Sequence, residues 1–88
     1  MDLLILKLKY HLEFVNQIIR LDHLMGLAHE LGFSAKVLTI IYSRPSDPAK
    51  LVHLECRKGA GRQLRIEPPF YIYKEEGGYT HAMQRLYD

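Results

Sequence analysis

Hydrophobic side chains occupy every second position from residue 4 to residue 14, and polar side chains fill the positions between them from residue 7 onward. A period of two over this length predicts a β-strand with one face against a core and one face in water. The apolar positions are Leu4, Leu6, Leu8, Tyr10, Leu12 and Phe14, and the polar positions are Lys7, Lys9, His11 and Glu13. A second alternating segment at 51–57 predicts another strand of the same kind. Its inward positions are Val52, Leu54 and Cys56, and its outward positions are His53, Glu55 and Arg57.

Between these two segments the spacing of the apolar residues changes to three and four. The apolar positions are Ile18, Leu21, Leu24, Met25, Ala28 and Leu31. This spacing predicts an amphipathic helix over 17–31, with Asn16 as its N-cap. Gly32 follows the last apolar position and suits the left-handed conformation that often ends a helix.

The remaining segments predict a sheet that continues toward the C-terminus. Residues 35–42 are rich in β-branched side chains and predict a largely buried strand, followed by a loop at 43–50. A glycine-containing turn at 58–63 leads to an extended segment that starts at 64–66. Pro68 and Pro69 exclude a central strand position there. Thr80 is a plausible N-cap for a last short helix through Tyr87. The predicted order is strand, helix, strand, strand, extended segment and helix, which is an α/β domain.

Length and composition limit the organisation of the chain. Its 88 residues suffice for a single domain, which we assign to 1–88. One cysteine, Cys56, excludes an internal disulfide and a cysteine-rich zinc site. No apolar run is long enough for a signal peptide or a membrane span, so a cytoplasmic protein without a membrane partner is expected.

The formal net charge of +2 conceals an uneven distribution. Residues 50–65 carry five basic side chains against Glu55 alone, a net charge of +4. The candidate RNA contacts in this segment are Lys50, Arg57, Lys58, Arg62 and Arg65. Clustered basic residues attract phosphates, and Tyr71 and Tyr73 follow as stacking surfaces for bases. The alternative interpretation is a solvated turn between two strands.

Other candidate chemistry is weak. His53 and Glu55 share a strand face, but no third ligand has a recognisable spacing, so no metal site is assigned. Cys56 is predicted to face the core, where a thiol is usually inert. The segment 67–70 reads Glu-Pro-Pro-Phe and resembles the Asp/Asn/Ser-Pro-Pro-aromatic motif of enzymes that methylate exocyclic amines. The longer glutamate side chain would misplace the hydrogen-bond acceptor, which favours a proline-fixed exit from the sheet.

Four motifs carry a family resemblance over residues 21–87. They are Tyr-Ser-Arg-Pro at 42–45, Pro-Ala-Lys at 48–50, Glu-x-x-Lys-Gly at 55–59 and Glu-Pro-Pro-Phe at 67–70. The sequence resembles the C-terminal region of bacterial S-adenosylmethionine-dependent tRNA adenine methyltransferases. These enzymes methylate the exocyclic amine of an adenine beside the anticodon of a valine tRNA. Residues 1–20 match that family poorly.

The resemblance implies part of a Rossmann-like methyltransferase fold, with the helix at 17–31 as its last helix. In that family the S-adenosylmethionine site and the catalytic Asn-Pro-Pro-aromatic motif lie in the part that precedes this region. No catalytic or cofactor-binding residue therefore carries over to this sequence, and the chain alone is expected neither to bind the cofactor nor to methylate.

Two other functions fit the same sequence. One is a small RNA-binding module that meets tRNA through the basic segment at 50–65. The other is a protein-interaction module, because an open sheet edge at 4–14 could pair with a second copy of the chain.

Overall fold

The computed structural model describes residues 3–61 and 63–87. The strands are β1 (Leu3–Lys7), β2 (His11–Gln17), β3 (Phe33–Tyr42), β4 (Ala49–Lys58), β5 (Arg65–Ile66) and β6 (Phe70–Tyr71). The helices are α1 (Leu21–Glu30), which follows a 3-10 turn at Ile18–Arg20, and α2 (His81–Arg85). The predicted α/β organisation is confirmed.

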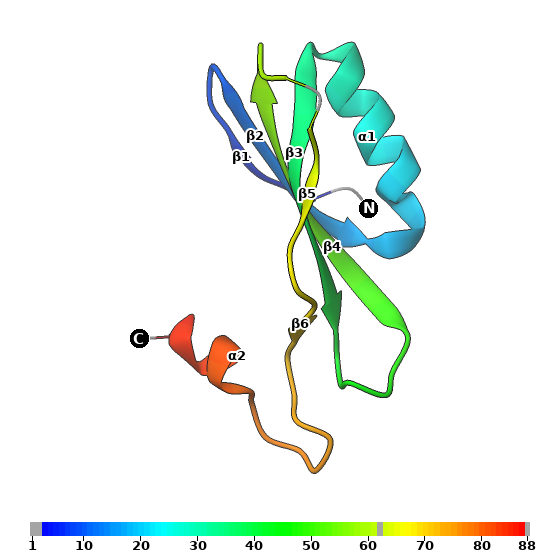
Figure 1. Ribbon diagram of the computed structural model, residues 1–88, viewed down its shortest axis with the longest axis vertical. Helices are drawn as coiled ribbons and strands as arrows, with labels where there is room; N and C mark the ends of the chain where they lie inside the picture. The colour runs from blue at the N-terminus through cyan, green and yellow to red at the C-terminus, as the bar shows by residue number, and fades with distance from the viewer. Residues whose placement is uncertain (1–2, 62, 88) are drawn as a thin grey trace.

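The strands form one mixed sheet in the order β1-β2-β4-β3-β5, and β6 also pairs with β3 (Figure 1). β4 runs antiparallel to both β2 and β3, so β2 and β3 are parallel to each other. α1 connects β2 to β3 as a crossover. β4 then lies between these two parallel strands and pairs with both. β5 and β6 lie parallel to β3 along its other edge.

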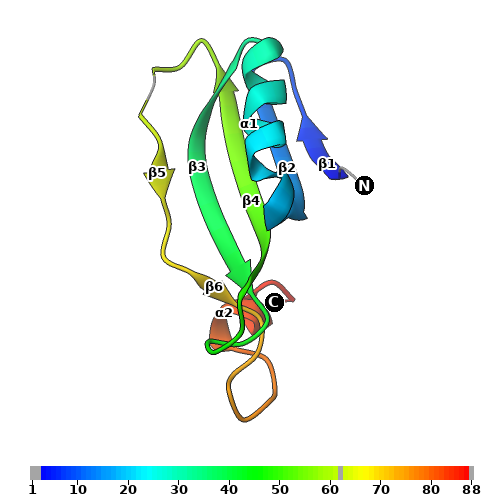
Figure 2. The ribbon, with the colours of Figure 1, turned by 90° about the vertical axis from the view of Figure 1, so that its right-hand side faces the viewer.

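α1 packs against one face of the sheet and buries the core there (Figure 2). The alternation at 51–57 predicted the core side of β4 correctly, because Val52, Leu54 and Cys56 are all fully buried. The core residues are Leu12, Phe14, Leu24, Ala28, Phe33, Leu38, Val52, Leu54 and Cys56. His11, Glu13, His53 and Glu55 occupy the alternate positions, so they project from the face opposite α1.

The single strand predicted at 4–14 is wrong, because the chain turns at residues 8–10 and forms a β1–β2 hairpin. The Leu8 N–H donates to the His11 carbonyl at 2.7 Å and closes this turn. Leu8 and Tyr10 are 57% and 60% exposed, although both belong to the apolar set of the alternation. The alternation continues through the turn at residues 8–10, so the sequence pattern did not show that β1 ends and β2 begins there.

The predicted start of the helix is also wrong, whereas its end is confirmed. Asn16 lies in β2 and is 4% exposed, and α1 begins only at Leu21. Gly32 has φ of +83° and its N–H donates to the His29 carbonyl at 2.9 Å, which ends the helix as expected. Phe33 then enters β3 directly and is buried in the core.

The C-terminal segment follows the free edge of β3 and then crosses to the face without α1 (Figure 1). Pro68 and Pro69 lie between the two short edge strands, as expected for residues that cannot take a central position. The Thr80 hydroxyl accepts from the Met83 N–H at 3.2 Å, which confirms the predicted cap of α2. No helix among the described residues is long and apolar enough to cross a membrane.

Candidate functional site

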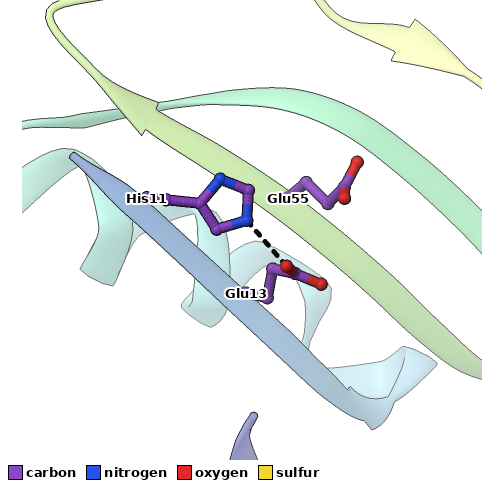
Figure 3. Close-up of side chains that lie close together, drawn as sticks. All are labelled: His11, Glu13 and Glu55. Atoms are coloured by element: carbon purple, nitrogen blue, oxygen red, sulfur yellow. Dashed lines mark hydrogen bonds and ion pairs between the residues drawn. The ribbon is translucent and has the colours of Figure 1, made fainter. Parts of the chain in front are cut away.

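The strands β2 and β4 bring two histidines and two glutamates together on the face opposite α1. The register places Glu13 directly opposite Glu55, Val15 opposite His53 and His11 opposite Arg57. Figure 3 shows His11, Glu13 and Glu55 on this face. The sequence indicated only the His53 and Glu55 pair, because the two partners on β2 are about 40 residues away and enter through strand pairing.

Glu13 is the centre of this cluster. The His11 Nε2–H donates to Glu13 Oε2 at 2.7 Å, and the His53 Nε2–H donates to Glu13 Oε1 at 2.6 Å. A carboxylate only accepts, so each histidine carries its proton on Nε2 in this arrangement. The His11 and Glu13 side chains are 17% and 18% exposed, so water still reaches the cluster.

These hydrogen bonds change the acidity of Glu13. The donors from His11 and then His53 hold the pKa of the Glu13 carboxyl below its usual value, and partial burial opposes them. Glu13 is consequently a carboxylate at neutral pH. Glu55 lies opposite it with the same charge, which is unfavourable unless a positive charge lies between them.

An apolar groove begins beside His53 on the same face. Side chains from β2, β3, β4, β6 and the residue after α2 line it, namely Val15, Thr39, Ile41, His53, Phe70 and Leu86. The C-terminal segment thus forms one wall of a groove whose floor is the sheet. One titratable side chain, His53, belongs to this otherwise largely apolar lining.

A separate basic surface lies at one end of the sheet, which we call the basic end. It consists of Lys7, Lys9, Arg57 and Lys58, all of them exposed. The Lys58 N–H donates to the Tyr10 carbonyl at 3.0 Å, and Lys7, Lys9 and Lys58 line one shallow pocket. The β1–β2 hairpin, with Lys7 at the end of β1 and Lys9 in the turn, therefore adds two lysines to the end of β4. Sequence reasoning missed them because they lie far ahead of the basic segment in the chain.

An exposed aromatic ring accompanies these cations. Tyr10 is 60% exposed, and the Lys9 Nζ lies 5.2 Å from the centre of its ring. An accessible tyrosine between lysines provides a stacking surface for an unpaired base together with charges for its phosphates.

The structure places two of the other candidate RNA contacts, Lys50 and Arg65, outside this surface. Lys50 lies at the opposite end of β4, which begins at Ala49 and ends at Lys58. Arg65 forms an ion pair with Glu67 at 2.8 Å on the outer edge. Arg62 lies outside the described residues. Arg57 and Lys58 are therefore the predicted contacts that gather with other cations.

Tyr71 and Tyr73 do not lie near the basic end, contrary to the expectation from sequence. Tyr71 pairs with Tyr42 at the far end of β3, and their ring centres are 5.3 Å apart. Tyr73 stacks on Tyr79 at 5.4 Å. The Arg57 and Lys58 positions pair with the first residues of β3 instead. These tyrosines mainly hold the C-terminal segment together.

Two further candidate residues have structural environments. Cys56 is fully buried, and burial together with the charge of Glu55 raises the pKa of its thiol to about 11. A thiol in that state is a poor nucleophile. The Glu67 N–H donates to the Leu38 carbonyl at 2.9 Å, and its carboxylate is held by Arg65. This favours the interpretation of 67–70 as an edge segment.

Comparisons with known proteins identify the fold. No family model and no curated protein matches the sequence. The structure is similar to that of a predicted O-methyltransferase from Agrobacterium tumefaciens, with a TM-score of 0.78 and 17% sequence identity. The match covers 86% of this chain but 36% of that one, so the chain spans little more than a third of the neighbour's length. The chain has part of a Rossmann-like methyltransferase fold, as the resemblance implied.

Proposed function

We propose that this chain is the C-terminal part of an S-adenosylmethionine-dependent methyltransferase that modifies the exocyclic amine of an adenine in tRNA. Its contribution is to bind RNA rather than to transfer the methyl group. The motifs at 42–45, 48–50 and 55–59 support the family, and the methyltransferase-like fold is consistent with it. The basic end is the observation that carries the RNA-binding role.

The residues present do not fit an S-adenosylmethionine pocket. Such pockets lie at the carboxyl ends of parallel strands and use a glycine-rich turn. The turn after β2 is Ile18–Arg20, which contains no glycine, and Ile19 is 81% exposed. The glycines at 59 and 61 follow β4, which is antiparallel to its neighbours, and no helix comes next. We therefore expect the cofactor to require another part of the enzyme.

The basic end supplies what RNA needs from a protein surface. Four exposed cations lie at the same end of the sheet as the exposed ring of Tyr10, and the Lys9 Nζ is 5.2 Å from the centre of that ring. Each cation that contacts a phosphate releases a counterion, so affinity depends steeply on salt. Binding of an unpaired loop also gains from stacking on an aromatic ring, which is worth roughly 1–3 kcal/mol per base.

The test is tRNA binding, measured by fluorescence anisotropy over a range of salt concentrations. The variants are Lys7→Ala with Lys9→Ala, and Arg57→Ala with Lys58→Ala. The matched control is Lys50→Ala with Lys74→Ala, which removes the same charge from exposed positions away from the basic end. Each test pair should lower the affinity for tRNA about tenfold. It should also reduce the slope of log affinity against log salt concentration by about one to two. An equal loss in the control pair would contradict a localised site.

A transfer assay with radiolabelled S-adenosylmethionine and unmodified tRNA tests the second half of the proposal. The chain alone should transfer no label. Turnover by residues 1–88 would show that a donor pocket exists and would overturn the division of roles.

A second candidate function is self-association. β1 is an edge strand of the sheet, and an edge with unpaired backbone groups can pair with a second copy. Light scattering at the highest attainable concentration tests it. A dimer supports pairing through β1, and a monomer counts against it.

A further inference from the structure

The His–Glu cluster on the face opposite α1 has the donor set of a metal site. One ligand atom each from His11, Glu13 and Glu55 lies within 4.8 Å of the others (Figure 3). The three residues come from two strands held in register by the sheet, so their backbones are rigidly positioned. Glu13 and Glu55 stand directly opposite each other in the register of β2 and β4.

We propose that His11 Nε2 and the carboxylates of Glu13 and Glu55 bind a divalent cation of the zinc type. A cation between the two glutamates removes their mutual repulsion. One imidazole with two carboxylates is a mixed nitrogen and oxygen donor set that suits zinc, whereas magnesium prefers oxygen ligands alone. Three protein ligands leave a fourth position open to water or a ligand.

Only small side-chain movements are needed. Bonds of about 2.0–2.2 Å require ligand atoms that are roughly 3.4 Å apart in a tetrahedral site. The present separations of up to 4.8 Å are close to that value. His11 and Glu13 are 17% and 18% exposed, so their side chains have room to adjust. Binding requires an unprotonated His11 Nε2. A neutral ring therefore moves its single hydrogen to Nδ1 by exchange with solvent, whereas a protonated ring releases its Nε2 proton to solvent and keeps the one on Nδ1.

His53 acts as a positioning residue in this site. Its Nε2–H donates to Glu13 Oε1 at 2.6 Å. The other oxygen, Oε2, becomes free to bind the cation once the His11 ring turns from Oε2 toward the cation. Hydrogen bonds of this kind orient carboxylate ligands, and their loss typically weakens metal binding about 10–100-fold. His53 also lines the apolar groove, so a molecule in the groove would lie close to the open position of the metal.

Calorimetric titration of the chain with zinc chloride at neutral pH, in a buffer that does not bind metal, tests the proposal. One cation should bind per chain. Glu13→Gln and Glu55→Gln should each lower the affinity about 100-fold, and His53→Asn about tenfold. The matched controls are Glu76→Gln and His29→Asn, which are exposed positions away from the cluster, and both should leave the affinity unchanged. Lowering the pH should weaken binding because protons compete for His11.

Absence of saturable binding, or equal losses in the controls, would overturn the proposal. Amide NMR spectra of each variant show whether it is folded, and X-ray absorption of the zinc-loaded wild-type chain gives a result that needs no variant. The expected coordination sphere holds one imidazole nitrogen and oxygens. A sulfur ligand, or a coordination sphere with several imidazoles, would assign the cation to other residues and would equally overturn it.

Discussion

Glu13 on β2 and His53 on β4 are joined by a hydrogen bond of 2.6 Å across the central antiparallel pair of the sheet. They lie in diagonal positions, because Glu13 directly faces Glu55 and His53 directly faces Val15. His11 occupies the other oxygen of the same carboxylate. Glu13 thus accepts a hydrogen bond from one histidine on its own strand and from one on the neighbouring strand, on a face that α1 does not cover.

The first prediction concerns the pH dependence of stability without metal. Hydrogen bonds from His11 and His53 lower the pKa of Glu13 in the folded chain, so its stabilising contribution is present above the ordinary value of 4.5. That contribution is lost as the pH falls through the lowered pKa. Glu13→Gln should cost about 1–2 kcal/mol near neutral pH and much less in acid. Urea unfolding with a chelator present measures this, and a cost that is independent of pH would contradict it.

The second prediction concerns the core. Leu54 is fully buried in the middle of β4, with Phe14 and Leu38 opposite it on the two neighbouring strands. Leu54→Ala should lower the free energy of unfolding by about 2–5 kcal/mol because it leaves a cavity there. Ile19→Ala is the control, since Ile19 is 81% exposed, and it should change stability by less than about 0.5 kcal/mol. Similar losses in both variants would show that the core is not under α1.

The sequence predicted the structure correctly where a single spacing of apolar residues extended over a single strand or helix. The alternation at 51–57 predicted the buried side of β4, and the apolar spacing predicted α1 and its end at Gly32. The alternation at 4–14 misled because Leu8 and Tyr10 keep the period through a turn in which both are exposed. Period alone does not detect a turn whose residues happen to continue the pattern.

The candidate sites were less predictable because strand pairing creates them. His53 and Glu55 lacked a third partner in the sequence, and the register of β2 against β4 places His11 and Glu13 beside them. The basic end arises in the same way, from the hairpin turn that sets Lys7 and Lys9 beside the end of β4. Register between distant strands depends on the whole sheet, so a single sequence without its fold does not determine it.

The third prediction compares two glycines. Gly32 has φ of +83°, a conformation that other residues adopt at a cost of about 1–2 kcal/mol. Gly32→Ala should therefore destabilise the chain by about that amount. Gly26 lies in α1, and nothing beyond the local helix backbone lies within 4 Å of where an alanine methyl group would be, so Gly26→Ala should stabilise by about 0.5–1 kcal/mol. Thermal unfolding followed by circular dichroism distinguishes the two, and shifts in the same direction would contradict the assigned helix end.

The fourth prediction concerns the thiol of Cys56. Burial and the charge of Glu55 raise its pKa from 9.0 to about 11. Between these values the unfolded chain ionises while the folded chain does not, so the stability that this group contributes is present below pH 9 and falls as the pH rises toward 11. Between pH 9 and pH 11 the free energy of unfolding should therefore fall by about 2 kcal/mol more in the wild-type chain than in Cys56→Ala.

Thiol labelling measures the same property directly. At mildly alkaline pH the folded chain should react with a disulfide reagent only as fast as it opens, because Cys56 is fully buried and un-ionised. In denaturant a single thiol should react at once, since Cys56 is the only cysteine. Rapid labelling of the folded chain would mean that β4 is accessible from the α1 side. It would contradict the packing that places Val52, Leu54 and Cys56 together beneath the helix.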